Sequence, residues 1–249
     1  MTNELYDKLK KKIEDGKITK EDIENAKKSR YFNINDKGDD GWTLLHWALF
    51  DNRIEEMKLL LDCGADVDAQ DDNGWTVCMN AARMGNIEAL RVFKERNPCI
   101  DIKDKQGMTA CIHAAAYNQI EALKVLVNEM GANIDLQDNN CMTASIHVAR
   151  WHKKETLFAL VELGANLSIR DNEGKTVFDF IDKDTKKKVI ELRRKYEAAH
   201  SEEPKMADEL AKIYLIPQEE IAVRGVGKSK IGDKARHHAG KENARPSMS

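Results

Sequence analysis

The sequence predicts an all-α solenoid of stacked helix-turn-helix units. Three observations support this class. One tract recurs with starts at residues 38, 71, 104 and 138, and a partial fifth copy begins at 171. Each copy combines a turn signal with two stretches of helical apolar spacing. Charged helical segments flank the copies, as a solenoid requires in order to close its two ends.

The composition is that of a globular protein with an uneven distribution of charge. Of 249 residues, 41% are hydrophobic and 33% are charged, and the formal net charge is -3. Residues 38–170 hold 13 basic and 20 acidic residues, whereas residues 222–249 hold 7 basic and 2 acidic residues. An acidic body with a basic tail excludes a strong attraction of the whole chain to nucleic acid.

Cysteine usage and hydropathy predict an intracellular protein. The five cysteines form no C-x-x-C pair, and their odd number prevents complete pairing within one chain, so we expect reduced thiols. No apolar run approaches the roughly 18 residues of a membrane span, and the start MTNELYDKLKKK has no apolar signal region. We therefore expect a cytoplasmic or nuclear location, no membrane insertion, and neither metal nor cofactor.

The N-terminal segment, residues 1–37, is expected to form a helical cap. The stretches ELYDKLKKKIEDG and TKEDIENAKKSR have an amphipathic pattern and a high charge content. Together they look like a degenerate, more charged version of the unit that follows. Such a segment would cover the first end of the apolar core.

Each repeat unit carries the signals of a turn followed by two helices. Asp-x-x-Gly marks the turn, and a threonine follows where its hydroxyl can cap a helix. Small residues such as Ala48 come five or six positions later and allow close helix packing. A second helical stretch ends at Gly64, Gly131 or Gly164, or at Asn97 in the second unit. The capping threonines are Thr43, Thr76, Thr109, Thr143 and Thr176.

These signals divide the chain into successive units. Four full repeats span residues 38–70, 71–103, 104–137 and 138–170. Residues 171–200 combine a degenerate fifth copy with a polar closing helix at DTKKKVIELRRKYEAA. Residues 201–249 are expected to hold one more helix, at PKMADELAKIYL, and then a basic tail with the composition of a disordered segment.

The four full units resemble ankyrin repeats. The segments GWTLLHWA and GADVDAQ of the first unit lie close to the family pattern, and several positions recur in register over residues 38–181. The family's proline after threonine is absent from every unit, its histidine is kept only as His46, and Cys141 replaces an expected turn glycine. The resemblance implies an ankyrin solenoid with β-turn fingers, and the departures concern its local rigidity.

The resemblance also implies where a partner protein would bind. In ankyrin-like folds the residue before the threonine lies in the finger, and residues late in the inner helix line a concave groove. Trp, Tyr and Arg at such positions are typical of binding hot spots. The alternative is that the finger residues only pack against one another. The finger residues are Trp42, Trp75, Met108 and Met142, and the groove residues are Phe50, Arg83, Met84, Tyr117, Arg150 and Trp151.

These features predict a non-enzymatic adaptor, scaffold or inhibitor that recognises another protein. The acidic turns flank the finger ridge, so we expect a partner with an apolar anchor and basic flanks. These turn residues are Asp39, Asp40, Asp71 and Asp72. An alternative function is a regulatory protein whose basic C-terminal tail tethers it to the cytoskeleton or to nucleic acid.

Two further patterns raise the question of an active site. Residues 222–229, AVRGVGKS, differ by one position from a phosphate-binding loop, but their surroundings lack the strand and helix that such a loop needs. His147 and His152 flank Trp151, yet a spacing of five misaligns them on a helix, so we interpret His147 as a packed residue. We predict no catalytic residue, and nucleotide binding at residues 222–229 is a remote alternative.

Overall fold

The computed structural model describes residues 4–38, 41–200 and 206–215, and over these residues it is helical with no strand. The α-helices are α1 (Glu4–Glu14), α2 (Lys20–Lys27), α3 (Leu44–Phe50), α4 (Ile54–Asp62), α5 (Val77–Met84), α6 (Ile87–Lys94), α7 (Ala110–Ala116), α8 (Ile120–Lys124), α9 (Ala144–Arg150), α10 (Lys154–Glu162), α11 (Lys183–His200) and α12 (Met206–Tyr214). The predicted all-α class is confirmed.

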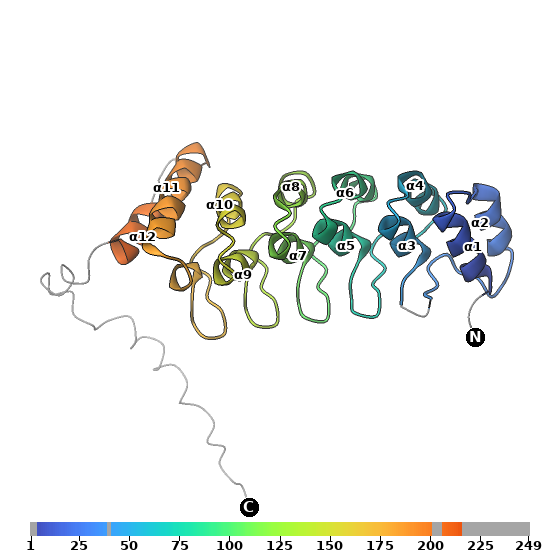
Figure 1. Cartoon of the computed structure of the whole chain (residues 1–249), viewed down its shortest axis with the longest axis horizontal. Coiled ribbons are helices and arrows are strands. Elements are labelled where there is room, and N and C mark those ends of the chain that lie inside the picture. The colour runs from blue at the N-terminus through green and yellow to red at the C-terminus, as the bar shows by residue number, and fades with distance from the viewer. Residues whose placement is uncertain (1–3, 39–40, 201–205, 216–249) are drawn as a thin grey trace, which may run out of the picture.

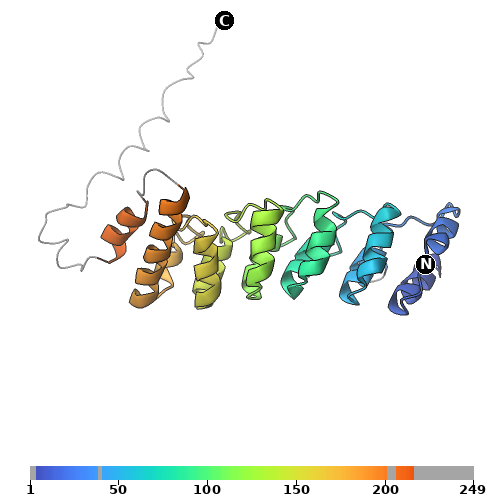
Figure 2. The same cartoon turned by 90° about the horizontal axis from the view of Figure 1, so that it is seen from above.

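The helices stack in two rows along one axis (Figure 1). The inner helices α3, α5, α7 and α9 form one row, and the outer helices α4, α6, α8 and α10 form the other. Finger loops project from the inner row, on the side away from the outer helices. Seen from above, α1 and α2 stand at one end, and α11 and α12 stand at the other (Figure 2).

The core runs the length of the stack because each unit buries the same positions. Leu60, Phe93, Leu126 and Leu160 lie at equivalent places in the outer row and are all fully buried. The inner row is lined with small residues, among them Ala48, which allow neighbouring helices to approach closely. Each unit therefore needs its neighbours to complete its core.

All five predicted threonines precede their helices as capping residues and are buried. Thr76 and Thr143 accept hydrogen bonds from the backbone N–H groups of Met79 and Ile146, each at 3.3 Å. Thr109 differs, since its buried hydroxyl has no hydrogen-bond partner. The hydroxyls of Thr43 and Thr176 instead contact the side chains of His46 and Asp179. The capping prediction is confirmed in position, and the bond from hydroxyl to backbone is made at Thr76 and Thr143.

The outer helices end as the sequence predicts. Gly64, Gly131 and Gly164 have φ angles of 89°, 72° and 89°, and Asn97 has a φ of 49°. These values lie in the left-handed region that ends a helix. A second left-handed position, between the inner and outer helices, was not anticipated, and His152 occupies it in the fourth unit with a φ of 55°.

The third unit accommodates one extra residue in a π-helical turn. The segment η1 (Val125–Glu129) follows α8 directly. Gly131 lies eleven positions after Ile120, whereas Gly64 lies ten positions after Ile54 in the first unit. The wider π turn absorbs the difference and leaves Leu126 in the core.

The finger loops are held by aspartates and are joined to one another. The Oδ1 atom of Asp104 accepts hydrogen bonds from the backbone N–H groups of Gln106 and Met108, both at 2.9 Å. Asp71, Asp138 and Asp171 make the equivalent bonds in their own units. Consecutive loops are linked by backbone bonds, such as Asn139 N–H to the Gln106 carbonyl at 3.0 Å.

Two terminal helices close the far end of the stack. A short 3-10 turn, η2 (Val177–Asp179), replaces the inner helix of the degenerate fifth copy. The helix α11 then packs against α10 of the fourth unit, and α12 packs against α11, where the sequence predicted a polar closing helix and a further helix. Among the described residues, no helix combines the length and the apolar character needed to cross a membrane.

Candidate protein-binding surface

Four large apolar side chains form an exposed row on the inner helices. Phe50, Met84, Tyr117 and Trp151 are 57%, 46%, 49% and 70% exposed. We call them the concave row, and we use "concave face" for the surface that they form with the finger loops. All four were predicted from the sequence as groove residues. Only Tyr31 and Ile213 are also large, apolar and exposed within the described part of the chain.

The concave row is exposed because of where the inner helices end. Each of its residues is the last helical residue or the first one after the helix, close to the turn into the outer helix. The residues one turn earlier, Ala81 and Ala114 among them, already fill the space against the neighbouring units. A large side chain at the end of the helix therefore extends into solvent.

The finger residues contribute both packing and surface. Trp42, Trp75 and Met108 are half-buried, whereas Met142 is buried. The Trp42 ring lies 4.9 Å from that of Trp47 and 5.4 Å from that of Phe50, measured between centroids. The two alternatives of binding and packing are thus not exclusive at the tryptophans. Met142, which is 9% exposed, offers almost no surface to a partner.

Arg83 connects the finger loops to the concave row. Its guanidinium lies 5.4 Å from the ring centroid of Trp75 and 4.7 Å from that of Tyr117. Cation–π contacts of this kind hold an arginine in place while its edge stays free to donate hydrogen bonds. Arg150 approaches the finger in a similar way, with Nη1 lying 3.8 Å from the sulfur of Met142.

A groove lies on the concave face between the third and fourth units. Its cavity volume is about 370 Å³, and its lining includes Met108, Tyr117, His147, Val148, Trp151 and Lys153. Pockets that receive small ligands typically have volumes of roughly 300–1,000 Å³. A smaller hollow with a volume of about 10 Å³ separates Phe50 from Met84 at the other end of the row.

The histidines of the inner helices serve the finger loops. His113 Nε2 lies 2.8 Å from Asp104 Oδ2, and His147 Nε2 lies 2.9 Å from Asp138 Oδ2. Burial lowers the pKa of His113, and the hydrogen bond to Asp104 offsets only part of that effect. The interpretation of His147 as a packed residue is confirmed. The pairing itself was missed, although both units show it in the sequence as Asp and His nine residues apart.

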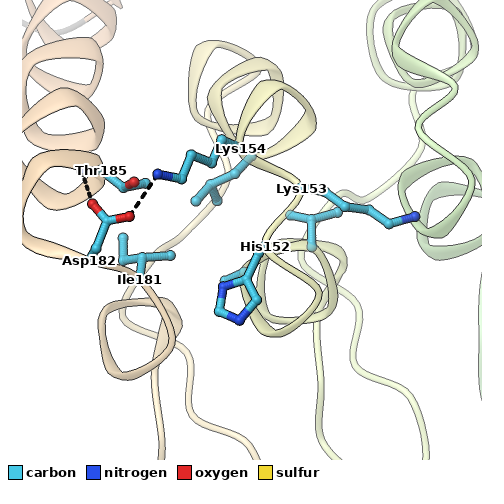
Figure 3. Close-up of a pocket in the computed structure, with 9 residues that line it drawn as sticks. His152, Lys153, Lys154, Ile181, Asp182 and Thr185 are labelled. Atoms are coloured by element: carbon cyan, nitrogen blue, oxygen red, sulfur yellow. Dashed lines mark hydrogen bonds and ion pairs between the residues drawn. The ribbon is translucent and has the colours of Figure 1, made fainter.

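His152 lines a hollow beside the start of the closing helix α11 (Figure 3). This hollow of about 10 Å³, roughly the space of one water molecule, is lined by His152, Lys154, Asp182 and Thr185. Lys154 Nζ lies 2.7 Å from Asp182 Oδ2, and the Thr185 backbone N–H donates to Asp182 Oδ1 at 2.8 Å. The Lys154 hydrogen bond, followed by those from Thr185, lowers the pKa of Asp182. This carboxylate caps α11, which is a structural role.

Of the four acidic turn residues, the structure describes Asp71 and Asp72. Asp71 is buried, and its Oδ1 accepts hydrogen bonds from Asn73 and Trp75 N–H at 2.7 and 2.9 Å. Asp72 lies 4.0 Å from Lys37 Nζ. Asp39 and Asp40 lie outside the described residues. The expectation of a partner with basic flanks therefore stays a prediction, and Asp71 does not contribute to it.

The five cysteines are free thiols. Cys63, Cys78 and Cys111 are buried, and Cys99 and Cys141 are exposed. Burial raises the pKa of Cys111 to about 12, which keeps the thiol protonated and unreactive. The described residues contain no group of three or more potential metal ligands.

The other predicted features lie beyond the part of the chain that the structure describes. These are the phosphate-loop-like residues 222–229 and the basic tail, residues 222–249, which we expected to be disordered. Nucleotide binding and tethering by the tail therefore stay predictions from the sequence.

Comparisons with known proteins agree with the repeat architecture. A family model described as ankyrin repeats (3 copies) matches residues 18–105, 45–138 and 93–171. The crystal structure of EF0377, an ankyrin repeat protein, superposes with a TM-score of 0.62 at 23% sequence identity. The superposition covers 78% of this chain and 97% of that chain, and at this identity it shows a shared fold. A search of curated proteins gave no match.

Proposed function

Since the chain belongs to the ankyrin repeat family, whose repeats form protein-interaction modules, we propose that it binds a partner protein through its concave face without catalysing a reaction. In this role it acts as an adaptor, scaffold or inhibitor in the cytoplasm or nucleus. The chemical groups that the concave face recognises determine which partner binds and therefore in which pathway the protein acts.

The concave row is the observation that carries this proposal. Four of the six large apolar side chains that are exposed in the described residues lie at the ends of the inner helices of consecutive repeats, three of them at the same repeat position and Phe50 one residue earlier. Exposed apolar patches are costly in a soluble protein and seldom persist without a partner. Aromatic residues beside arginine, as at Tyr117 and Arg83, are also the composition of binding hot spots.

The finger loops give the face the rigidity that tight recognition favours. Four of the finger loops are each locked by an aspartate that accepts two backbone hydrogen bonds, and two of these four gain a third bond from a histidine. A preformed surface loses little conformational freedom when it binds, so more of the contact energy appears as affinity. The His113–Asp104 and His147–Asp138 pairs, which could suggest acid–base chemistry, hold the finger loops in place.

An affinity capture experiment with mass spectrometry tests the proposal. The variant Met84→Ala/Tyr117→Ala/Trp151→Ala removes most of the concave row, and hot-spot truncation typically costs roughly 2 kcal/mol or more per residue. We expect partners of the wild-type chain to be lost from this variant. The control Tyr31→Ala/Ile213→Ala removes apolar side chains of similar exposure elsewhere and should retain them.

Circular dichroism shows whether each variant keeps its helical content and unfolds cooperatively. Partners that stay bound to a folded triple variant, or that are lost equally from the control, would contradict recognition by the concave face.

A further inference from the structure

The groove between the third and fourth units differs in volume from the hollow between Phe50 and Met84, and it has positively charged groups around it. Tyr117 and Trp151 form part of its lining, and both are largely exposed. With a volume of about 370 Å³, it has room for a large side chain of a partner, whereas the hollow between Phe50 and Met84 has not. The groove is therefore the larger of these two hollows on the concave face.

The charged groups around this groove are mainly positive. Arg83 lies against Tyr117, and Arg150 immediately precedes Trp151. Within the described residues, neither arginine has a carboxylate at ion-pair distance, whereas most other arginines do. The paired arginines are Arg91, Arg96, Arg193 and Arg194.

The acidic groups near the groove are already bound. Asp138 is hydrogen-bonded to His147 and to two backbone N–H groups. Glu173 pairs with Lys175 at 2.6 Å. The two arginines, together with Lys153, whose Nζ donates to the Ala116 carbonyl, are thus the charged groups left to complement a ligand.

We propose that the groove receives a large apolar side chain from a peptide segment of the partner protein, and that a carboxylate beside that side chain pairs with Arg83 or Arg150. This inference rests on the proposed function and specifies the chemistry of the partner. A planar guanidinium matches a carboxylate with two parallel hydrogen bonds, so the arginines would fix the position of the anchor.

Charge favours this occupant over a segment of the chain itself. The basic tail, residues 222–249, has 7 basic and 2 acidic residues and would place like charges against the arginines. An acidic, apolar segment of another protein satisfies both the groove and its rim.

Selection of random peptides displayed on phage, with the full chain as the target, tests the proposal. We expect the selected sequences to share a large apolar residue with Asp or Glu within about two positions. Synthetic copies should bind at least about tenfold more weakly to Tyr117→Ala/Trp151→Ala and to Arg83→Glu/Arg150→Glu. The matched control for charge is Lys20→Glu/Lys183→Glu, which reverses two exposed lysines at the starts of α2 and α11 and should bind normally.

Several results would overturn the inference. They are selection of basic peptides, selection without a shared motif, and equal binding by the groove variants. Competition by a synthetic peptide of residues 216–249 would make the tail the occupant. A dimer in sedimentation that is lost in Tyr117→Ala/Trp151→Ala would make it a second copy.

Experiments can distinguish failure of this inference from failure of the proposed function. A partner captured by Tyr117→Ala/Trp151→Ala but lost from a Phe50→Ala/Met84→Ala variant would keep the concave face as the binding surface. It would place the anchor at the other end of the row and remove the groove from recognition.

Discussion

At the scale of single residues, the finger turns show how much stability is lost when a residue other than glycine occupies the turn position. The turn glycines Gly41, Gly74, Gly107 and Gly174 have φ angles from 72° to 83°, and Cys141 is held at the same place with a φ of 58°. An L-residue in this left-handed conformation is disfavoured by roughly 1–2 kcal/mol. Gln137 and Asp138 precede the turn and keep it in place, because Gln137 donates to the Cys141 carbonyl and Asp138 accepts from the Met142 N–H.

The turn positions give a pair of opposite predictions. Cys141→Gly should raise the free energy of unfolding by about 0.5–1 kcal/mol. Glycine removes the strain of the left-handed turn, and this gain exceeds the stability lost because glycine gives the unfolded chain more conformations. Gly107→Ala should lower it by about 2 kcal/mol, because the new Cβ would lie 2.7 Å from the backbone nitrogen of Asn139.

Urea unfolding followed by circular dichroism measures both changes. Equal effects of the two substitutions would mean that the turn tolerates side chains generally, and that left-handed strain is not what distinguishes these positions.

At the scale of the helices, one buried ion pair joins the repeats to the closing helices. Arg193 Nε lies 2.8 Å from Glu197 Oε1, and both side chains are almost fully buried. The same guanidinium donates to the carbonyls of Gly164 and Ala165, both at 3.2 Å. Glu197 also accepts from the Ala207 N–H, which ties α12 to α11.

Removal of Arg193 should therefore destabilise the C-terminal end strongly. Arg193→Ala leaves Glu197 buried without its partner, a change that typically costs about 3 kcal/mol or more. The neighbouring Arg194→Ala is the matched control, since the Arg194–Asp208 pair is more than half exposed and should contribute less than about 1 kcal/mol.

Thermal unfolding and limited proteolysis near residues 200–206 measure the two losses. Similar stability of the two variants would show that the buried pair is not what fastens α11 and α12 to the stack.

At the scale of the whole molecule, buried histidines make stability depend on pH. Burial lowers the pKa of both His46 and His113 from the ordinary value of 6.5. The unfolded chain then binds more protons than the folded chain between the lowered pKa values and 6.5. The free energy of unfolding should fall as the pH drops through this window, by up to about 1.4 kcal/mol per pH unit for each histidine.

Urea unfolding at about pH 7.5 and about pH 5.5 tests this dependence. His113→Gln retains an N–H donor that can reach Asp104, so it should still fold and should show a smaller loss at the lower pH. A loss equal to that of the wild-type chain would assign the pH dependence to other groups.

The repeat architecture could be predicted because every unit repeats the same local signals. Turn aspartates, capping threonines and terminal glycines act within a few residues, so Thr76 and Gly64 could be assigned from sequence alone. The exposed concave row followed from the same register. The predicted binding role of these residues stays a prediction until a partner is found.

Other features depend on contacts between units that spacing does not reveal. The burial of Met142 and the pairing of Arg193 with Glu197 arise from how neighbouring units pack. The π turn at η1 was visible only as one additional residue in the third unit. Whether such a residue enters a loop or a helix depends on which arrangement keeps Leu126 in the core.

The concave row also has a regular spacing along the solenoid. Packed helices are separated by about 8–10 Å, so the solenoid offers one apolar side chain at each such step. An extended partner segment rises about 3.3 Å per residue and would match these steps with every third side chain. A helical partner rises about 1.5 Å per residue and would match them with every sixth or seventh. The spacing of anchors along a partner is therefore set by the thickness of one repeat.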